Sequence, residues 1–205
     1  MSAHGLSFAM TGADGEGGGP DVVLLPGWLD ADAASELFEA LHAGLPWQVH
    51  RIRMFGRELE APRLSCWIGD PGTTYRYSGV AHRPHPWPST LLPLRARLAA
   101  ETGVDFNSVL ANLYRDGRDA MGWHSDDEPE LGVRPLIASL SLGATRRFML
   151  RARREPSRRH VFELVHGSLL LMRGETQSGW RHALPRTARQ VGPRINLTFR
   201  RILAR

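Results

Sequence analysis

From Phe106 onward the sequence repeats with the period of a β-strand. Six short segments between 106 and 203 are separated by turn or loop signals, and several of them alternate polar with apolar side chains. They read FNSVLANLY, PLIASLSLG, RRFMLRA, HVFELV, SLLLMR and PRINLTFRRIL. Such a run is typical of an antiparallel sandwich or barrel. We therefore predict a mainly β protein whose core occupies about 106–203.

Two helices are expected to flank this core on its N-terminal side. Asp30 is placed to cap a helix over about 30–43, where apolar residues recur with helical spacing. A second helix is expected over about 89–102, with a proline tolerated in its first turn. Residues 1–20 end in the glycine-rich TGADGEGGGP and are expected to form a flexible tail. The remainder, 21–205, is predicted to be a single domain.

Composition excludes several classes of protein. The chain has 205 residues, of which 42% are hydrophobic, as in globular proteins that fold around their own core. No run approaches the ~18 apolar residues of a membrane span, and the N-terminus lacks a cleavable signal. A cytoplasmic monomer without a membrane anchor is therefore expected. Cys66 is the only cysteine, which excludes an internal disulfide and a cysteine-built zinc site.

The positive charge is all arginine and is concentrated toward the C-terminus. Every one of the 26 basic residues is arginine. Residues 146–205 hold fifteen of them against three glutamates, whereas 1–50 hold seven acids and no arginine. This sorting favours a polyanionic partner for the C-terminal third and argues against contact by the first fifty residues. Genome composition also explains the missing lysine, and a solvated loop explains any single arginine of 153–159.

Three residues have the chemistry of a metal site. His124 and Asp126 are two positions apart, so on an extended chain both side chains project to the same side. His182 follows after several predicted strands. Each residue alone is more often structural. Together, two histidines and one carboxylate are the ligand set of non-haem Fe(II) oxygenases.

The segment 194–200, RINLTFR, alternates strictly between apolar and polar side chains. Its polar face carries Arg194, Asn196, Thr198 and Arg200. Two arginines on one strand face are costly unless that face is solvated or meets an anion. The guanidinium fork matches a carboxylate. Beside an iron triad, this face predicts a site for a dicarboxylate, which indicates Fe(II) and 2-oxoglutarate.

These blocks resemble the AlkB family of Fe(II)/2-oxoglutarate-dependent dioxygenases, in particular its nucleic-acid repair branch. The matching stretches cover about two-thirds of the chain: APRL…WIGDPGTTYRYSG at 61–79, TGVDFNSVLANLYRDGRDAMGWHSDDEPELG at 102–132, PLIASLSLGATRRFMLR at 135–151, HGSLLLM at 166–172 and PRINLTFR at 193–200. The resemblance implies a double-stranded β-helix (jelly-roll) core with an N-terminal nucleotide-recognition lid at about 50–85.

The resemblance also implies an activity. With Fe(II), 2-oxoglutarate and O2, a relative of this kind oxidises the N-methyl group of 1-methyladenine or 3-methylcytosine in DNA, with RNA as an alternative substrate. The products are the repaired base, formaldehyde, succinate and CO2. The protein's part is to position the methyl group and to shield the reaction from water.

Roles for individual residues follow from the matched motifs. The two histidines and Asp126 named above would bind Fe(II). The cosubstrate residues would be Asn112, Tyr114, Arg194, Asn196 and Arg200. Arg194, aided by Asn196 and Tyr114, would pair with the distal carboxylate of 2-oxoglutarate, and the others would surround the end that chelates iron. Which arginine meets which carboxylate stays open.

A base in a duplex must be flipped out of the stack to reach a buried iron. The residues expected to contact substrate are Phe55, Trp67, Tyr75, Tyr77, Ser78, Asp127 and Glu128. The aromatic residues of 75–78 would stack on the flipped base, and the two acids would accept hydrogen bonds from its amino group or pair with an arginine instead. Phe55 suits a wedge that fills the gap and equally suits the core of a β-hairpin.

Two other functions stay open from the sequence. One is a 2-oxoglutarate dioxygenase that acts on a protein or a small molecule, and the other is a catalytically inactive nucleic-acid-binding module. The aromatic and acidic residues of the implied base site and the basic C-terminal third argue against the first. The intact ligand set argues against the second, because a binding module needs neither the metal nor the cosubstrate.

Overall fold

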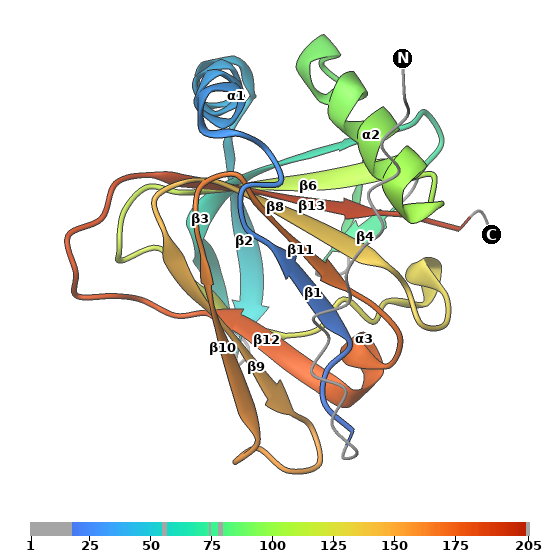
Figure 1. Cartoon of the computed structure of the whole chain (residues 1–205), viewed down its shortest axis with the longest axis vertical. Coiled ribbons are helices and arrows are strands. Elements are labelled where there is room, and N and C mark those ends of the chain that lie inside the picture. Colours follow the sequence, from blue (N-terminus) through green and yellow to red (C-terminus); the bar gives the residue numbers. More distant parts are fainter. Residues whose placement is uncertain (1–17, 55–56, 74, 78–79, 204–205) are drawn as a thin grey trace.

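The structure is a computed structural model that describes residues 18–54, 57–73, 75–77 and 80–203 (Figure 1). The side chains of 51–58 and 74–82 are not described. Phe55, Ser78 and residues 1–17 of the expected tail therefore lie outside the described residues. Within the described ranges, no helix has the length and apolar character that crossing a membrane would require.

Both expected helices form, and their ends follow from local sequence. Helix α1 spans Ala31–Gly44, and the Asp30 carboxylate accepts a hydrogen bond from the backbone N–H of Ala33 at 2.9 Å. Helix α2 spans Leu92–Thr102 and follows the short 3₁₀ helix η1 at Ser89–Leu91. Gly103 ends α2 with φ +72°, a left-handed conformation that glycine adopts without strain.

A seven-stranded antiparallel sheet forms the larger layer of the fold (Figure 1). Its strands are, in spatial order, β1 (Val22–Leu25), β11 (Ser168–Met172), β8 (Ile137–Gly143), β13 (Arg194–Arg200), β6 (Ser108–Tyr114), β3 (Arg57–Gly69) and β2 (Gln48–Met54). Strand β13 lies at its centre, between β8 and β6. The segment with the strictest alternation therefore has a hydrogen-bonded neighbour on each side.

A second, four-stranded antiparallel sheet forms the smaller layer. Its order is β10 (Arg159–Leu164), β9 (Arg146–Ala152), β12 (Trp180–Leu184) and β7 (Met121–His124). The remaining elements are the hairpin β4 (Tyr75–Tyr77) and β5 (Val80–His82), the 3₁₀ helix η2 (Pro129–Leu131) and the short helix α3 (Thr176–Gly179). All six predicted segments form strands. Within 106–203 the prediction omitted β7 and β12, which are short and carry polar residues in place of a clear alternation. Before residue 106 it named no strand, whereas β1, β2 and β3 belong to the large sheet.

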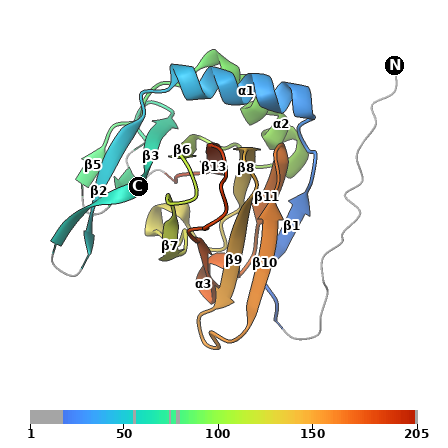
Figure 2. The same cartoon turned by 90° about the vertical axis from the view of Figure 1, so that its left-hand side faces the viewer.

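The large sheet separates two hydrophobic clusters. On one face, α1 and α2 pack against the sheet (Figure 2), and Ile195, Leu197 and Phe199 of β13 are fully buried there. On the other face, the second cluster joins the large sheet to the small one through residues such as Ile137 and Leu150. The polar face of β13 therefore points into the space between the two sheets. That face is buried, so the solvated-edge explanation for its arginines does not apply.

Candidate metal and cosubstrate site

The three predicted metal ligands converge on one point at the small sheet. His124 ends β7, and His182 lies opposite it in the register between β12 and β7. Asp126 follows two residues after His124. The potential ligand atoms of these three side chains all lie within 4.8 Å of one another. Strand pairing therefore brings together residues that are 58 positions apart in the sequence.

Neighbouring polar groups orient these ligands. The Nδ1 atom of His124 lies 2.8 Å from the carbonyl oxygen of Gly122, which leaves Nε2 for a metal. The backbone N–H of Asp126 donates to Oε1 of Gln177 at 3.0 Å. Nδ1 of His182 is buried and has no hydrogen-bond partner among the described residues. Gln177 is a buried residue of α3, and no pattern in the sequence singles it out.

The electrostatics of the triad suit a divalent cation. Burial lowers the pKa of His182 to about 3 and also lowers the pKa of His124, so both imidazoles are neutral at physiological pH. Burial raises the pKa of Asp126, but Arg200 and the two histidines outweigh it and leave the pKa at about 2. Two neutral imidazoles and one carboxylate are the protonation states in which these groups ligate metals.

Arg194 is a buried cation on the inner face of β13, with a side chain whose donors are only partly used. It is 1% exposed. Its Nη2 atom donates to Oγ of Ser141 and to Oδ1 of Asn196, both at 2.9 Å. Its Nε and Nη1 atoms are buried without a hydrogen-bond partner among the described residues. Leaving such donors unsatisfied is costly, and a carboxylate is the group that fits a guanidinium fork.

The strand next to β13 completes this pocket. In register, Tyr114 and Asn112 of β6 lie opposite Arg194 and Asn196. The Arg194 guanidinium carbon is 5.3 Å from the centre of the Tyr114 ring. Oδ1 of Asn112 accepts a hydrogen bond from Nε of Arg63 at 3.0 Å. The five predicted cosubstrate residues therefore lie together on two paired strands.

One cavity connects the triad with this polar face. Its lining includes the three metal ligands and all five predicted cosubstrate residues, together with Ser139, Thr198 and the apolar Phe148, Leu184, Met121 and Met172. Arg200 lies at the metal end, where its Nη2 atom donates to Oδ1 of Asp126 at 2.8 Å. Because Arg200 is engaged by Asp126 and two donors of Arg194 have no hydrogen-bond partner among the described residues, the residues present fit an iron ion chelated at one end and a carboxylate held at the other.

Comparison with known proteins agrees with this geometry. A family model described as the 2OG-Fe(II) oxygenase superfamily matches residues 21–200. This chain belongs to that superfamily. Fe(II), 2-oxoglutarate and O2 are therefore the cofactor and cosubstrates of this oxygenase. The solved structure of OsALKBH1 matches 89% of this chain and 99% of that chain with a TM-score of 0.63 at 21% identity, which shows a common fold.

The oxygenase is also similar in sequence to alkB homologues. It is 42% identical over 190 residues to the alpha-ketoglutarate-dependent dioxygenase alkB homolog 3 of Bos taurus, across 88% of this chain and 66% of that protein. It is 40% identical over 213 residues to the DNA oxidative demethylase ALKBH2 of Bos taurus, across 99% of this chain and 75% of that protein. Within the superfamily, the oxygenase belongs to the AlkB family.

The residues expected to contact substrate lie in different environments, unlike the metal and cosubstrate residues, which line one cavity. Asp127 is exposed and forms an ion pair with Arg153, which is the alternative that the sequence left open for this acid. Glu128 is half-buried just before η2. Tyr75 and Tyr77 lie on β4, with no description of their side chains.

Trp67 lies in a buried position on β3. Its side chain is 8% exposed, packs in the cluster between the two sheets, and donates from Nε1 to Oγ of Ser108 at 2.8 Å. It is not among the residues that line the cavity of the triad. Trp67 is therefore packed in the core between the sheets, and its role as a base contact stays a prediction. An aromatic residue before a tyrosine-rich segment has the same sequence pattern whether it packs in the core or stacks on a base.

Proposed function

We propose that this oxygenase is an oxidative demethylase that repairs 1-methyladenine and 3-methylcytosine in DNA, with RNA as an alternative substrate. The observation that carries the proposal is the shared cavity, in which the metal triad faces a buried arginine with two unused donors. The substrate class is inferred from the alkB homologues, one of which is named a DNA oxidative demethylase.

In this proposal, different residues of the cavity bind the metal and the cosubstrate. His124, Asp126 and His182 hold Fe(II), and Arg194 holds the distal carboxylate of 2-oxoglutarate. Bound iron and 2-oxoglutarate would supply the oxidation of the N-methyl group by O2. Arg200 fixes the Asp126 carboxylate through its 2.8 Å hydrogen bond.

The protein's other contribution is to align and shield the reactants. Asn196 accepts from both Arg194 and Ser139, which fixes the guanidinium in the plane that a carboxylate needs. Phe148 and Leu184 line the cavity with apolar surface that excludes water.

The finer architecture is part of the same proposal. We infer a double-stranded β-helix core in which residues of about 50–85 form a nucleotide-recognition lid. Two strand pairs support it: β2 pairs with β3, and the hairpin of β4 and β5 follows in the chain. Phe55, which lies between the β2 and β3 segments in the sequence, would act as the wedge, and the aromatic residues of 75–78 would stack on the base.

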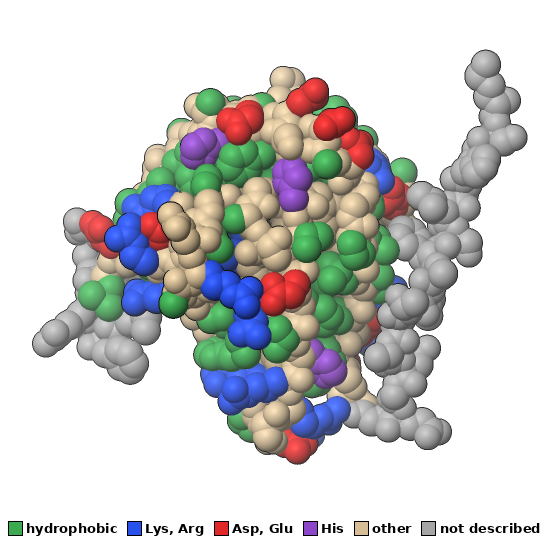
Figure 3. All heavy atoms as spheres, turned by 60° about the vertical axis from the view of Figure 1, so that its left-hand side comes forward, with side chains coloured by type: hydrophobic (Ala, Val, Ile, Leu, Met, Phe, Trp, Pro, Cys, Tyr) green, Lys and Arg blue, Asp and Glu red, His purple; other side chains and the backbone are tan. Residues whose placement is uncertain are grey.

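The surface charge supports an acidic polymer as substrate. In the view of Figure 3, acidic side chains gather at the top of the molecule, the end where α1 lies, while arginines gather in the middle and lower parts. Exposed arginines include Arg153, Arg154, Arg158, Arg159 and Arg181. Phosphate contacts by such residues make binding strongly dependent on salt. A steep loss of affinity with added salt is expected, and a flat response would contradict this part of the proposal.

The test is a demethylation assay on matched single-stranded and duplex oligonucleotides carrying 1-methyladenine or 3-methylcytosine. Iron-loaded protein with 2-oxoglutarate should restore the unmodified base and release formaldehyde, and Asp126→Ala should do neither. Succinate formation with a peptide or small molecule, but no repair of either oligonucleotide, would favour a different substrate class. Binding of the oligonucleotides without any turnover would favour an inactive binding module.

The wedge assignment has its own test. Phe55→Ala should reduce repair of duplex DNA more than repair of single strands, because only the duplex needs a filler for the vacated position. Equal losses on both substrates would place Phe55 in the hairpin core instead.

A further inference from the structure

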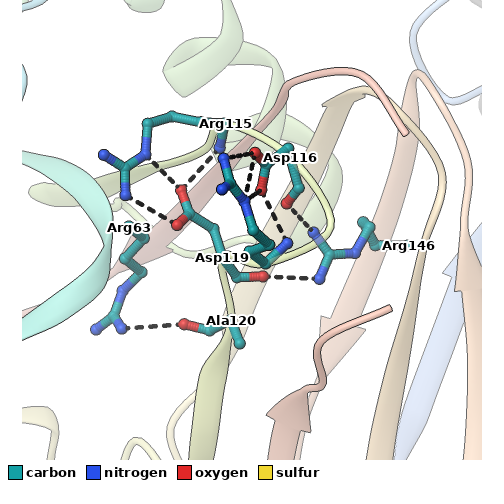
Figure 4. A network of polar contacts seen from close by, with 7 residues as sticks. Arg63, Arg115, Asp116, Asp119, Ala120 and Arg146 are labelled. Carbon is teal, nitrogen blue, oxygen red and sulfur yellow. Dashed lines mark hydrogen bonds and ion pairs between the residues drawn. The ribbon is translucent and has the colours of Figure 1, made fainter. Parts of the chain in front are cut away.

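Arg146, the first residue of β9, is a buried cation that forms no ion pair with a carboxylate in the described part of the chain. It is 3% exposed. Its guanidinium instead donates to three backbone carbonyl oxygens: that of Asp116 at 3.0 Å, that of Asp119 at 2.8 Å and that of Pro185 at 2.7 Å. Figure 4 shows the first two of these contacts. Neutral carbonyls hold the group in place, and no described carboxylate contacts it directly, although Asp119 and Asp116 favour its charge from a distance.

These carbonyls belong to the segments that adjoin the two metal-binding strands. Asp116 and Asp119 lie in the loop 115–120, which leads into β7 and His124. Pro185 directly follows β12, the strand of His182. Arg146 therefore fixes its own guanidinium to the same framework that positions the metal ligands.

The loop 115–120 is itself held by further ionic contacts (Figure 4). Nε and Nη2 of Arg115 donate to the two oxygens of the Asp119 carboxylate at 2.8 and 2.9 Å. Nη1 of Arg63 reaches the Ala120 carbonyl at 3.5 Å. Both acids of the loop are thus paired with arginines of the loop, and neither forms an ion pair with Arg146.

Arg146 and Arg194 lie near the same aromatic ring. The guanidinium carbon of Arg146 is 5.8 Å from the centre of the Tyr114 ring, and that of Arg194 is 5.3 Å from it. Burial lowers the pKa of both arginines, and the charge of Arg146 adds to this effect at Arg194, whose pKa stays at about 10. Both groups therefore remain charged at neutral pH. Arg194 lines the cavity, whereas Arg146 lies outside the cavity lining, near the same Tyr114 ring. Neither arginine forms an ion pair with a carboxylate in the part of the chain that the structure describes.

We propose that Arg146 is a positioning residue that makes the cosubstrate pocket selective for a dicarboxylate: it holds a second, fixed positive charge beside the Arg194 cradle. The inference rests on the proposed function, because it assumes that a 2-oxo acid chelates iron at the triad. A distal carboxylate at Arg194 gains from both charges, whereas a monocarboxylate 2-oxo acid places no charge there. Removing Arg146 should therefore weaken the first ligand and spare the second.

The experiment measures binding and needs no turnover. Protein loaded with Mn²⁺ is titrated by calorimetry, without nucleic acid, with the dicarboxylate N-oxalylglycine and separately with the monocarboxylate 2-oxobutyrate. Arg146→Gln should raise the Kd of N-oxalylglycine by roughly tenfold, the effect of one charge acting through a partly screened interior. The Kd of 2-oxobutyrate should stay unchanged. In turnover, the same variant should raise KM for 2-oxoglutarate much more than it lowers kcat.

Two further variants separate charge from structure. Arg147→Gln removes the adjacent arginine, which is exposed and faces Glu163, and should leave both Kd values unchanged. Arg146→Lys keeps the charge but loses the fork, so its Kd for N-oxalylglycine should stay within about threefold of wild type even where its thermal stability falls. If Arg146→Gln does not fold, the comparison of Arg146→Lys with wild type still tests whether the charge at this position sets the affinity for N-oxalylglycine.

Three results would overturn the inference: unchanged affinity of Arg146→Gln for N-oxalylglycine, an equal loss for both acids, or a loss in Arg146→Lys as large as in Arg146→Gln. Failure of the wild-type protein to bind N-oxalylglycine would instead contradict the cosubstrate site itself. The two failures are therefore distinguishable.

Discussion

The buried ion pair between Arg200 and Asp126 yields a quantitative prediction for the metal-free protein. Its N–O distance is 2.8 Å, and the two side chains are 6% and 4% exposed. Arg200→Met removes the cation and keeps a long, unbranched side chain in its space. Removing one partner leaves the carboxylate buried without its counter-charge, which typically costs about 3–5 kcal/mol. We expect a loss of that size in the free energy of unfolding at pH 7.

The pH dependence of this loss has a definite sign. In the wild type, the pKa of Asp126 falls from 3.8 to about 2, with Arg200 as the largest lowering influence against burial. The depressed pKa contributes about 2 kcal/mol that is present above pH 3.8 and is lost as the pH falls toward 2. Without Arg200, only the two histidines oppose the effect of burial, so the pKa of Asp126 rises from its wild-type position. The variant then gains stability relative to the wild type as the pH falls from 7 to 4.

Urea unfolding of the metal-free proteins between pH 4 and pH 7 measures both effects. Arg201→Met is the matched control, because Arg201 is the next residue and is exposed. The gap between wild type and Arg200→Met should narrow on acidification, while the control stays close to wild type throughout. A gap that is below about 1 kcal/mol at pH 7, or that does not change with pH, would refute the assignment of Arg200 as the counter-charge of Asp126.

Three further predictions concern single residues. Asp126→Ala should lose Mn²⁺ binding in calorimetry while its far-UV circular dichroism stays native; retained metal affinity would contradict the triad. Gln177→Leu removes the acceptor for the Asp126 backbone N–H, so it should destabilise the protein by about 1–3 kcal/mol in urea unfolding and weaken Mn²⁺ binding, and no change in either would contradict its orienting role. At Gly143, φ is +84° and an added Cβ would lie 2.5 Å from the Pro193 carbonyl oxygen. Gly143→Ala should therefore lower the free energy of unfolding by about 1–3 kcal/mol in urea unfolding. Gly44→Ala should leave it unchanged, because an added Cβ there meets nothing within 4 Å; equal stabilities of the two variants would contradict this account.

Much of the fold could be predicted from local sequence patterns. The cap at Asp30 and the glycine at the end of α2 predicted the bounds of the helices, and the alternation of polar and apolar residues predicted six strands of the β core. Strands β7 and β12 were missed because their extended form depends on pairing with partners far away in the sequence. The arrangement of the strands into two facing sheets depends in the same way on contacts that no local pattern encodes.

The residues of the site could be predicted where the chemistry requires an unusual residue type. Residues that only orient others through packing and single hydrogen bonds could not. The arginines of β13 and the two histidines stand out because burying them demands a partner. Ser141 and Gln177 orient that chemistry through single hydrogen bonds, yet each resembles an ordinary polar residue in the sequence. The burial of Trp67 was also not predictable, because an indole side chain suits base stacking as well as it suits the core position that Trp67 has on β3.

The most direct test of the account is the ratio of succinate to formaldehyde in one reaction. The iron-loaded protein, 2-oxoglutarate, O2 and an oligonucleotide carrying 1-methyladenine should yield equal amounts of the two products, and neither should exceed background in Asp126→Ala. Succinate in excess, with no formaldehyde and no repaired base, would show that the cavity oxidises 2-oxoglutarate without acting on a methylated base. That result would contradict the central claim.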